Sequence, residues 1–285
     1  MTQATTQPTT KNTGQATGQT SGQTSGQPTG NTVTAPIIEL RRFGTLGAAN
    51  QGWLDARHHF SFAGYHDPAR VQWGAIRVWN DDTIAPGTGF PTHPHNDMEI
   101  VTYVRRGAIT HRDNQGNEGR TMAGDVQVMS AGRGIAHSEY NREDEDTQIF
   151  QIWILPDERG GAPFWGARAF PKHERAGQLV TLASGSVPAG AGASGDSDGD
   201  SGGDSDTPLP IRADAKIMGA TLRQGASVTH TIGDARRHLY LVPAIGKVQI
   251  GDVVAQARDG VAITGLEEVT ITALEDSEVV LVEAR

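Results

Sequence analysis

The chain has 285 residues, which is enough for one large domain or two small ones. It contains no cysteine, so disulfides, thiolate nucleophiles, iron–sulfur clusters and cysteine-ligated zinc are excluded. The net charge of −9, from 24 basic and 33 acidic side chains, argues against a nucleic-acid-binding surface, which needs a basic face. No apolar run approaches the roughly 18–20 residues that span a bilayer, and the first residues lack a basic segment followed by an apolar one. A cytoplasmic location without membrane contact is therefore expected.

Residues 1–35 consist almost wholly of Thr, Gln, Gly, Ser, Asn, Ala and Pro. Such a composition cannot bury enough apolar surface to offset the entropy lost on ordering, so a disordered low-complexity tail is predicted. The tail carries no motif that indicates a binding partner.

The rest of the chain is typical of an all-β protein. Short segments rich in Val, Ile, Thr and aromatic residues alternate with Gly, Asp and Pro, and no segment keeps a 3.6-residue apolar period for three turns. The expected strands include residues 74–79, 98–104, 126–129, 148–155, 238–242, 247–250, 269–272 and 278–282. Segment 148–155 is apolar at both odd and even positions, which predicts a strand covered on both faces. Many short strands at this spacing favour a sandwich or barrel, and the length allows two.

A second low-complexity segment, residues 184–208, interrupts the later strands. It holds five aspartates and no basic residue, so it supplies −5 of the net charge of −9. Its Asp-x-Asp-x-Asp spacing resembles part of an EF-hand calcium loop, but the glutamate at the twelfth position and the flanking helices are missing. A disordered acidic surface insertion is the favoured interpretation, and a calcium loop is the alternative.

The residues best suited to chemistry lie between positions 87 and 141. His93 and His95 are two residues apart, as are His137 and Glu139, and glycines flank both pairs. Because side chains at i and i+2 share one face of a strand, two antiparallel strands would bring all four groups together. Three imidazoles and a carboxylate suit Fe, Ni, Cu or Zn. Either pair alone is more often structural, but their joint occurrence favours a metal site. Glu99, with the parity of His93 and His95, is a candidate ligand, hydrogen-bond partner of a ligand or proton acceptor.

These segments resemble the two cupin motifs and, more specifically, the pirin family. The matching residues include His93-Pro94-His95, Met98-Glu99-Ile100-Val101-Thr102-Tyr103-Val104, Gly124-Asp125-Val126-Gln127, Met129-Ser130-Ala131-Gly132, Gly134-Ile135, His137-Ser138-Glu139 and Gln151-Ile152-Trp153. The resemblance begins near Ile37 and runs to the C-terminus, leaving out the tail and the acidic insertion. Asn96 departs from the family pattern, since many relatives carry arginine there.

The resemblance implies a bicupin, in which two jelly-roll-like cupin β-barrels pack together. The expected domains are a metal-binding barrel at 36–166 and a metal-free barrel at 167–285 that carries the insertion at 184–208. One divalent metal is implied, usually Fe(II), with Ni, Cu, Mn, Co or Zn as alternatives. Its ligands map to His93, His95, His137 and Glu139, and Glu99 is then a neighbour of the site and not a ligand. A monomer is also implied.

The other histidines are interpreted as structural. The C-terminal half has no His-x-His or His-x-Glu pair, so His230 and His238 are expected to be structural or exposed. His58 and His59 lie in a family-like segment and are candidates to border the pocket, although a structural role is favoured. The same interpretation applies to the isolated residues His66, His111 and His173.

Because the family includes proteins that resemble quercetin 2,3-dioxygenases, a flavonol dioxygenase is the leading hypothesis. The metal would lower the pKa of the flavonol 3-hydroxyl, and Glu139 would accept the proton as the catalytic base. O2 would then add across the heterocycle, which opens with loss of carbon monoxide. The alternative is an iron-binding redox sensor that acts through a protein partner, as described for eukaryotic pirins. An enzyme needs an open, partly apolar cavity beside the metal and a sensor does not. A zinc-dependent cupin sugar isomerase is a third hypothesis.

Overall fold

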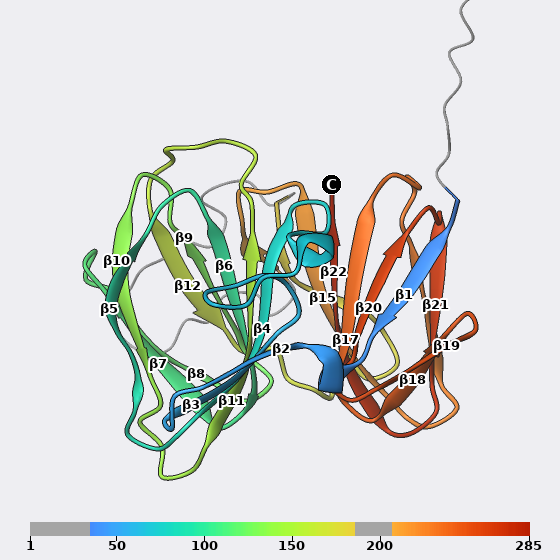
Figure 1. Cartoon of the computed structure of the whole chain (residues 1–285), viewed down its shortest axis with the longest axis horizontal. Helices are drawn as coiled ribbons and strands as arrows, with labels where there is room; N and C mark the ends of the chain where they lie inside the picture. The colour runs from blue at the N-terminus through green and yellow to red at the C-terminus, as the bar shows by residue number, and fades with distance from the viewer. Residues whose placement is uncertain (1–34, 186–206) are drawn as a thin grey trace, which may run out of the picture. The chain divides into compact units, whose positions relative to one another are not determined.

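The computed structural model describes residues 35–185 and 207–285, which are almost entirely β-structure (Figure 1). The disordered tail expected at 1–35 and the acidic insertion expected at 184–208 lie outside the described residues, apart from their ends. Two 3-10 turns, η1 (Phe43–Thr45) and η2 (Pro68–Arg70), are the helical elements of the described residues. No helix in this part of the chain is long and apolar enough to cross a membrane.

The first barrel is a sandwich of a seven-stranded and a four-stranded sheet. The larger sheet has the order β12-β9-β6-β11-β4-β3-β2 and the smaller sheet the order β5-β10-β7-β8. The strands are β2 (Gly47–Asn50), β3 (Leu54–His58), β4 (Ile76–Ile84), β5 (Gly89–His95), β6 (Glu99–Arg106), β7 (Ala108–Asp113), β8 (Glu118–Met122), β9 (Val126–Ser130), β10 (Ile135–Tyr140), β11 (Thr147–Ile154) and β12 (Phe164–Arg168).

The second barrel repeats this plan, with sheet orders β1-β20-β17-β22-β15-β13-β14 and β16-β21-β18-β19 (Figure 1). Its strands are β1 (Ile37–Arg41), β13 (Val180–Ser184), β14 (Leu209–Pro210), β15 (Ala215–Leu222), β16 (Ser227–Thr231), β17 (His238–Ile245), β18 (Lys247–Ile250), β19 (Val253–Gln256), β20 (Gly260–Thr264), β21 (Glu268–Ala273) and β22 (Ser277–Ala284). All eight segments expected to be strands overlap a strand of one barrel or the other.

The two seven-stranded sheets share one apolar core. Trp79 of β4 and Phe150 of β11 belong to the same buried cluster as Tyr240 of β17 and Val282 of β22. The rings of Trp79 and Tyr240 lie 5.5 Å apart, and both residues are fully buried. Each large apolar side chain buried here contributes about 1.5–3 kcal/mol relative to exposure. The predicted architecture, two cupin barrels packed together, is therefore confirmed.

Strand β11 shows how the sequence pattern relates to this packing. Phe150 and Ile152 belong to the core shared by the two barrels, whereas Ile149 belongs to a separate cluster of the first barrel. Gln151 has the parity of Ile149 and donates a hydrogen bond to Glu139 of β10. The strand is apolar on both faces because one face meets the second barrel and the other lines the first.

Two strands do not follow the expected domain ranges of 36–166 and 167–285. Strand β1 lies within the first range but pairs with β20 in the sheet of the second barrel. Strand β12 runs across the expected boundary and pairs with β9 of the first barrel. Arg41, at the end of β1, is 1% exposed, and its guanidinium lies 5.3 Å from the ring centre of Phe60. A local pattern specifies a strand but not its partner, which tertiary contacts select.

Candidate metal centre

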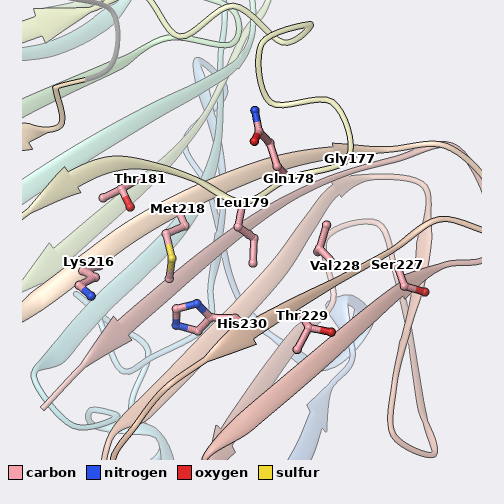
Figure 2. Close-up of a pocket in the computed structure, with 10 residues that line it drawn as sticks. All are labelled: Gly177, Gln178, Leu179, Thr181, Lys216, Met218, Ser227, Val228, Thr229 and His230. Atoms are coloured by element: carbon pink, nitrogen blue, oxygen red, sulfur yellow. The ribbon is translucent and has the colours of Figure 1, made fainter.

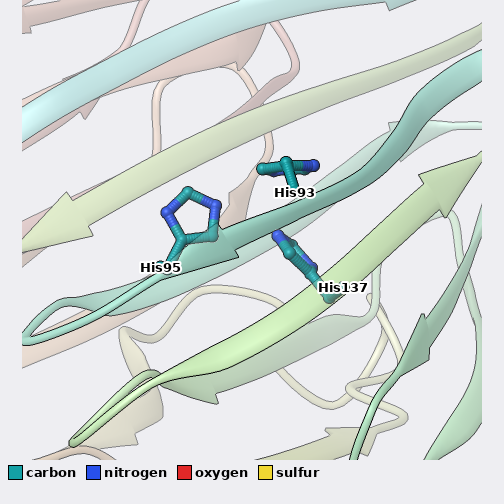
Figure 3. A group of neighbouring side chains, drawn as sticks. All are labelled: His93, His95 and His137. Carbon is teal, nitrogen blue, oxygen red and sulfur yellow. The ribbon is translucent and has the colours of Figure 1, made fainter.

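Three imidazoles converge on the inner face of the four-stranded sheet (Figure 3). His93 and His95 project from β5, and His137 lies directly opposite His93 in the antiparallel pairing of β5 with β10. The ring centres lie 4.5 Å apart for His93 and His137, 4.8 Å for His93 and His95, and 5.0 Å for His95 and His137. One ligand atom from each residue lies within 4.8 Å of the others. The structure thus brings together three of the four expected metal ligands.

The hydrogen bonds of these rings leave nitrogen lone pairs free for a metal. Nδ1 of His93 lies 2.7 Å from the carbonyl oxygen of Pro91, so Nδ1 donates and Nε2 is the bare nitrogen. Nε2 of His137 is buried and has no hydrogen-bond partner among the described residues. Burial and the neighbouring imidazoles lower the pKa of His95 to about 4 and that of His137 to about 3. Neutral imidazole is the form that binds metals, so this donor set fits a divalent cation.

Glu139, the fourth expected ligand, is placed differently. The pairing of β5 with β10 shifts register after His137, and Glu139 lies opposite Phe90. Its buried carboxylate accepts hydrogen bonds from Gln127 Nε2 and Gln151 Nε2, each at 2.7 Å. Glu139 groups with His111 and His137 as possible ligands, and not with His93 and His95. Oε1, the oxygen bonded to Gln127, also accepts from Thr102 Oγ1 at 3.4 Å, whereas Oε2 keeps a second lone pair beside the Gln151 amide. Glu139 as a ligand and base stays a prediction.

Glu99, the expected neighbour of the site, faces elsewhere. Its carboxylate accepts hydrogen bonds from Ser130 Oγ at 2.5 Å and from the backbone N–H of Arg212 at 3.1 Å. Burial raises the pKa of Glu99 above its ordinary value, although these two hydrogen bonds oppose the shift. The parity argument that linked Glu99 to His95 does not extend through the turn between β5 and β6, where Asp97 has a φ of 48°. Residues on either side of such a turn do not keep one alternation of faces.

His111 was assigned a structural role from the sequence, but it touches the centre. Its ring is fully buried, and its Nδ1 lies 3.4 Å from Nδ1 of His137. On its other side, Nε2 lies 3.1 Å from the carboxylate of Asp113. The sequence signal for this arrangement was His111-x-Asp113 on one strand, the same i, i+2 spacing as His137-x-Glu139. That spacing does not predict which strand pairs with β10.

Aromatic side chains surround the open side of the cluster. His93 and His95 are half-buried, as are Phe90, Trp153 and Phe62. The ring of His95 meets the edge of Trp153 with centres 5.0 Å apart, and Trp153 meets Phe62 at 5.4 Å. The imidazoles therefore lie beside flat apolar surfaces that solvent reaches, a combination typical of small-molecule sites.

Three other histidines, His58, His59 and His238, have partners outside this cluster. Nδ1 of His58 lies 2.8 Å from the side-chain oxygen of Asn80, and Nδ1 of His59 lies 2.9 Å from the hydroxyl of Tyr240. His238 packs edge-on against Trp73.

A separate hollow of about 520 Å³ opens between β13, β15 and β16 of the second barrel (Figure 2). Lys216, Met218 and Thr229 contribute to its walls, and His230 is its single histidine. Nε2 of His230 lies 2.5 Å from Glu283 and so already has a partner. The expectation that the second barrel binds no metal stays a prediction.

Comparison with known proteins gives consistent matches along the chain. A family model described as Pirin matches residues 40–154, and one described as quercetinase C-terminal cupin domain matches residues 200–284. A pirin-like protein from Caulobacter vibrioides is 57% identical over 249 residues, which are 87% of this chain and 100% of that protein. A quercetin 2,3-dioxygenase from Escherichia coli K12 is 39% identical over 246 residues, which are 86% of this chain and 97% of that protein. The crystal structure of a bacterial pirin from Escherichia coli in complex with nickel(II) matches with a TM-score of 0.76 and 38% identity, covering 87% of this chain and 99% of that one.

Proposed function

Since this chain belongs to the pirin family, we propose that it is a metal-dependent dioxygenase that cleaves a flavonol such as quercetin with O2. The observation that carries the proposal is the group of three imidazoles, with bare nitrogens on His93 and His137, set among half-buried aromatic rings. A regulator needs the metal but not half-exposed aromatic rings beside it.

His93, His95, His137 and Glu139 would hold the metal. Imidazole and carboxylate donors suit Fe(II), which is the favoured ion, and they also suit Ni, Cu, Mn, Co or Zn. The relative solved in complex with nickel(II) supports a divalent cation. When bound, the metal supplies Lewis-acid and, for a redox ion, electron-transfer chemistry to the hydroxyl of the substrate and to O2.

The protein itself would orient the substrate and take its proton. The ring of Trp153 lies 5.0 Å from that of His95 and the ring of Phe90 lies 6.3 Å from that of His93, and a flavonol is a flat aromatic molecule that would stack on such rings. Glu139 would accept the proton of the flavonol 3-hydroxyl as the catalytic base. The amides of Gln127 and Gln151 fix its carboxylate plane, so the remaining lone pair of Oε2 has a defined direction. O2 then adds across the heterocycle, and two carbon–carbon bonds break with release of carbon monoxide.

Oxygen consumption with quercetin tests the proposal. The full chain is stripped of metal and reloaded separately with Fe(II), Mn(II), Ni(II), Co(II), Cu(II) and Zn(II), with His93→Ala as the matched control. We expect O2 uptake and carbon monoxide release that require a redox metal and disappear in His93→Ala. Tight metal binding without O2 uptake for any flavonol would overturn the proposal and favour a redox regulator that acts through a protein partner.

A further inference from the structure

A line of hydrogen-bonding groups runs from His137 into the interior of the first barrel. Nδ1 of His137 lies 3.4 Å from Nδ1 of His111, and Nε2 of His111 lies 3.1 Å from Oδ2 of Asp113. The side chains of His111 and Asp113 are both fully buried. Water therefore does not replace any of these contacts, and both ring nitrogens of His111 must find their partners within the line.

The hydrogen bonds around Asp113 determine where the protons lie. Besides His111, its carboxylate accepts from the backbone N–H groups of Gln115 and Asn117, at 2.9 and 3.0 Å, and from Asn117 Nδ2 at 2.8 Å. A carboxylate with four donors around it acts as an acceptor, so Nε2 of His111 carries the proton. Nδ1 of a neutral His111 is then an acceptor, and Nδ1 of His137 must be the donor. This leaves a bare lone pair on Nε2 of His137, which is the buried nitrogen without a partner.

The surroundings of His111 hold its ring in one plane. Trp165 stacks on it with ring centres 4.8 Å apart and planes 9° from parallel. Gly119 lies opposite His111 in the pairing of β7 with β8. A Cβ on Gly119 would come within 2.1 Å of Cη2 of Trp165, so the stack needs glycine at that position. The position of the ring is thus fixed by packing as well as by hydrogen bonds.

We propose that Asp113 and His111 are positioning residues that set the tautomer and the ring plane of His137 through a carboxylate–imidazole–imidazole relay. The relay rests on the proposed metal site, since it prepares Nε2 of His137 to bind the ion. Hydrogen-bond partners of metal-binding histidines commonly change metal affinity by about 10- to 100-fold when they are removed. His111 acts through His137 and is not itself a ligand, although one ligand atom each of His111, His137 and Glu139 lie within 4.8 Å of one another.

Variants of His111 distinguish the effect of its hydrogen bonds on His137 from the effect of its packing against Trp165. His111→Phe keeps a flat ring against Trp165 and removes the acceptor. His111→Gln provides an amide oxygen that can accept from His137 and an amide N–H that can donate to Asp113. His58→Phe is the matched control, because it removes another buried, hydrogen-bonded imidazole of the same barrel.

The measurement is the affinity of each full-length protein for Zn²⁺ alone, by competition with a chromophoric chelator. We expect His111→Phe to lose about 10- to 100-fold in affinity, Asp113→Asn to lose less, and His111→Gln and His58→Phe to stay near the wild type. Equal affinities for His111→Phe and the wild type, or equal losses for His111→Phe and His111→Gln, would overturn the relay. A wild type that binds no Zn²⁺ would instead overturn the proposed metal site.

A second measurement on the wild type keeps the test decisive if His111→Phe does not fold. Long-range ¹H–¹⁵N spectra of the histidine rings in the Zn²⁺-loaded protein report which nitrogen carries the proton. We expect a proton on Nε2 of His111 and on Nδ1 of His137. Zn²⁺ on Nδ1 of His111 would make that residue a ligand and would contradict the proposal.

Discussion

The hydroxyl of Tyr103, on β6 of the first barrel, donates a hydrogen bond to the carboxylate of Glu278, on β22 of the second. The same hydroxyl accepts a hydrogen bond from Nη2 of Arg175 at 3.0 Å, and Nζ of Lys172 lies 2.6 Å from the other Glu278 oxygen. Tyr103, Arg175 and Glu278 are at most 2% exposed. A polar group that lacks a hydrogen-bond partner lowers the stability of the fold more when it is buried than when it is exposed. This network therefore favours the one alignment of the sheets in which all its groups are hydrogen-bonded.

Removing the Tyr103 hydroxyl tests the contribution of this network. Tyr103→Phe keeps the ring but leaves buried Glu278 and Arg175 each short of one partner, so we expect the free energy of unfolding to fall by about 1–3 kcal/mol. Urea denaturation measures the change. Tyr140→Phe, at a half-buried tyrosine of β10, is the matched control and should change stability by about 0.5 kcal/mol or less. Equal stability of the two variants would contradict a structural role for the network.

His59 makes stability depend on pH. Burial, with smaller contributions from Arg41 and other arginines, lowers the pKa of His59 well below 6.5, so the folded protein keeps this imidazole neutral. The unfolded chain takes up the proton below its ordinary pKa, so this residue makes the protein less stable as the pH falls through 6.5. The expected loss between pH 7.5 and 5.5 is about 1.4 kcal/mol. Comparison of unfolding free energies for the wild type and His59→Gln isolates the effect.

The control for this pH dependence is His173→Gln, because the side chain of His173 is 83% exposed. We expect His59→Gln to reduce the fall in stability by about 1.4 kcal/mol and His173→Gln to leave it unchanged. Part of the fall remains in His59→Gln because His95 and His137 also have lowered pKa values. A wild-type loss that persists in full in His59→Gln would place the responsible group elsewhere.

Local patterns were enough to predict the strands and the histidine pairs. The apolar residues at both odd and even positions of β11 and the i, i+2 spacing of His93 and His95 are each local to one strand, and both are present in the structure. The close approach of His137 to His93 followed from the assumption of antiparallel pairing, which the register of β5 and β10 satisfies.

Features that depend on pairing partners could not be predicted in this way. The contact of His111 with His137 requires β7 to lie beside β10, and the pairing of β1 with β20 joins segments more than 200 residues apart in the chain. Glu99 shows a different difficulty, because the left-handed backbone of Asp97 ended the alternation on which its assignment depended. Register and turn conformation are set by tertiary contacts that a single strand does not contain.

Gln151 should govern the orientation of Glu139. Gln151→Leu removes one of the two amide donors, so the carboxylate can turn away from the imidazoles. If Glu139 is a ligand, we expect the affinity for Zn²⁺ to fall by about 10- to 100-fold and flavonol turnover to fall with it. Gln148→Leu is a control on the same strand, since Gln148 is half-buried and three residues away. Equal Zn²⁺ affinities for the two variants would show that the amide does not act on the metal site.

The glycine opposite His111 provides a test of packing beside the site. Gly119→Ala places a methyl group within 2.1 Å of Trp165, and neither the strand backbone nor the half-buried indole, which stacks on His111, can move away without repacking. Overpacking of this kind costs about 1–3 kcal/mol of unfolding free energy. Because the indole also holds the plane of His111, we expect Zn²⁺ affinity to fall together with stability. Gly64→Ala is the control, since a Cβ there meets no atom within 4 Å. A Gly119→Ala protein that is less stable but binds Zn²⁺ as the wild type does would show that His111 keeps its plane without Trp165.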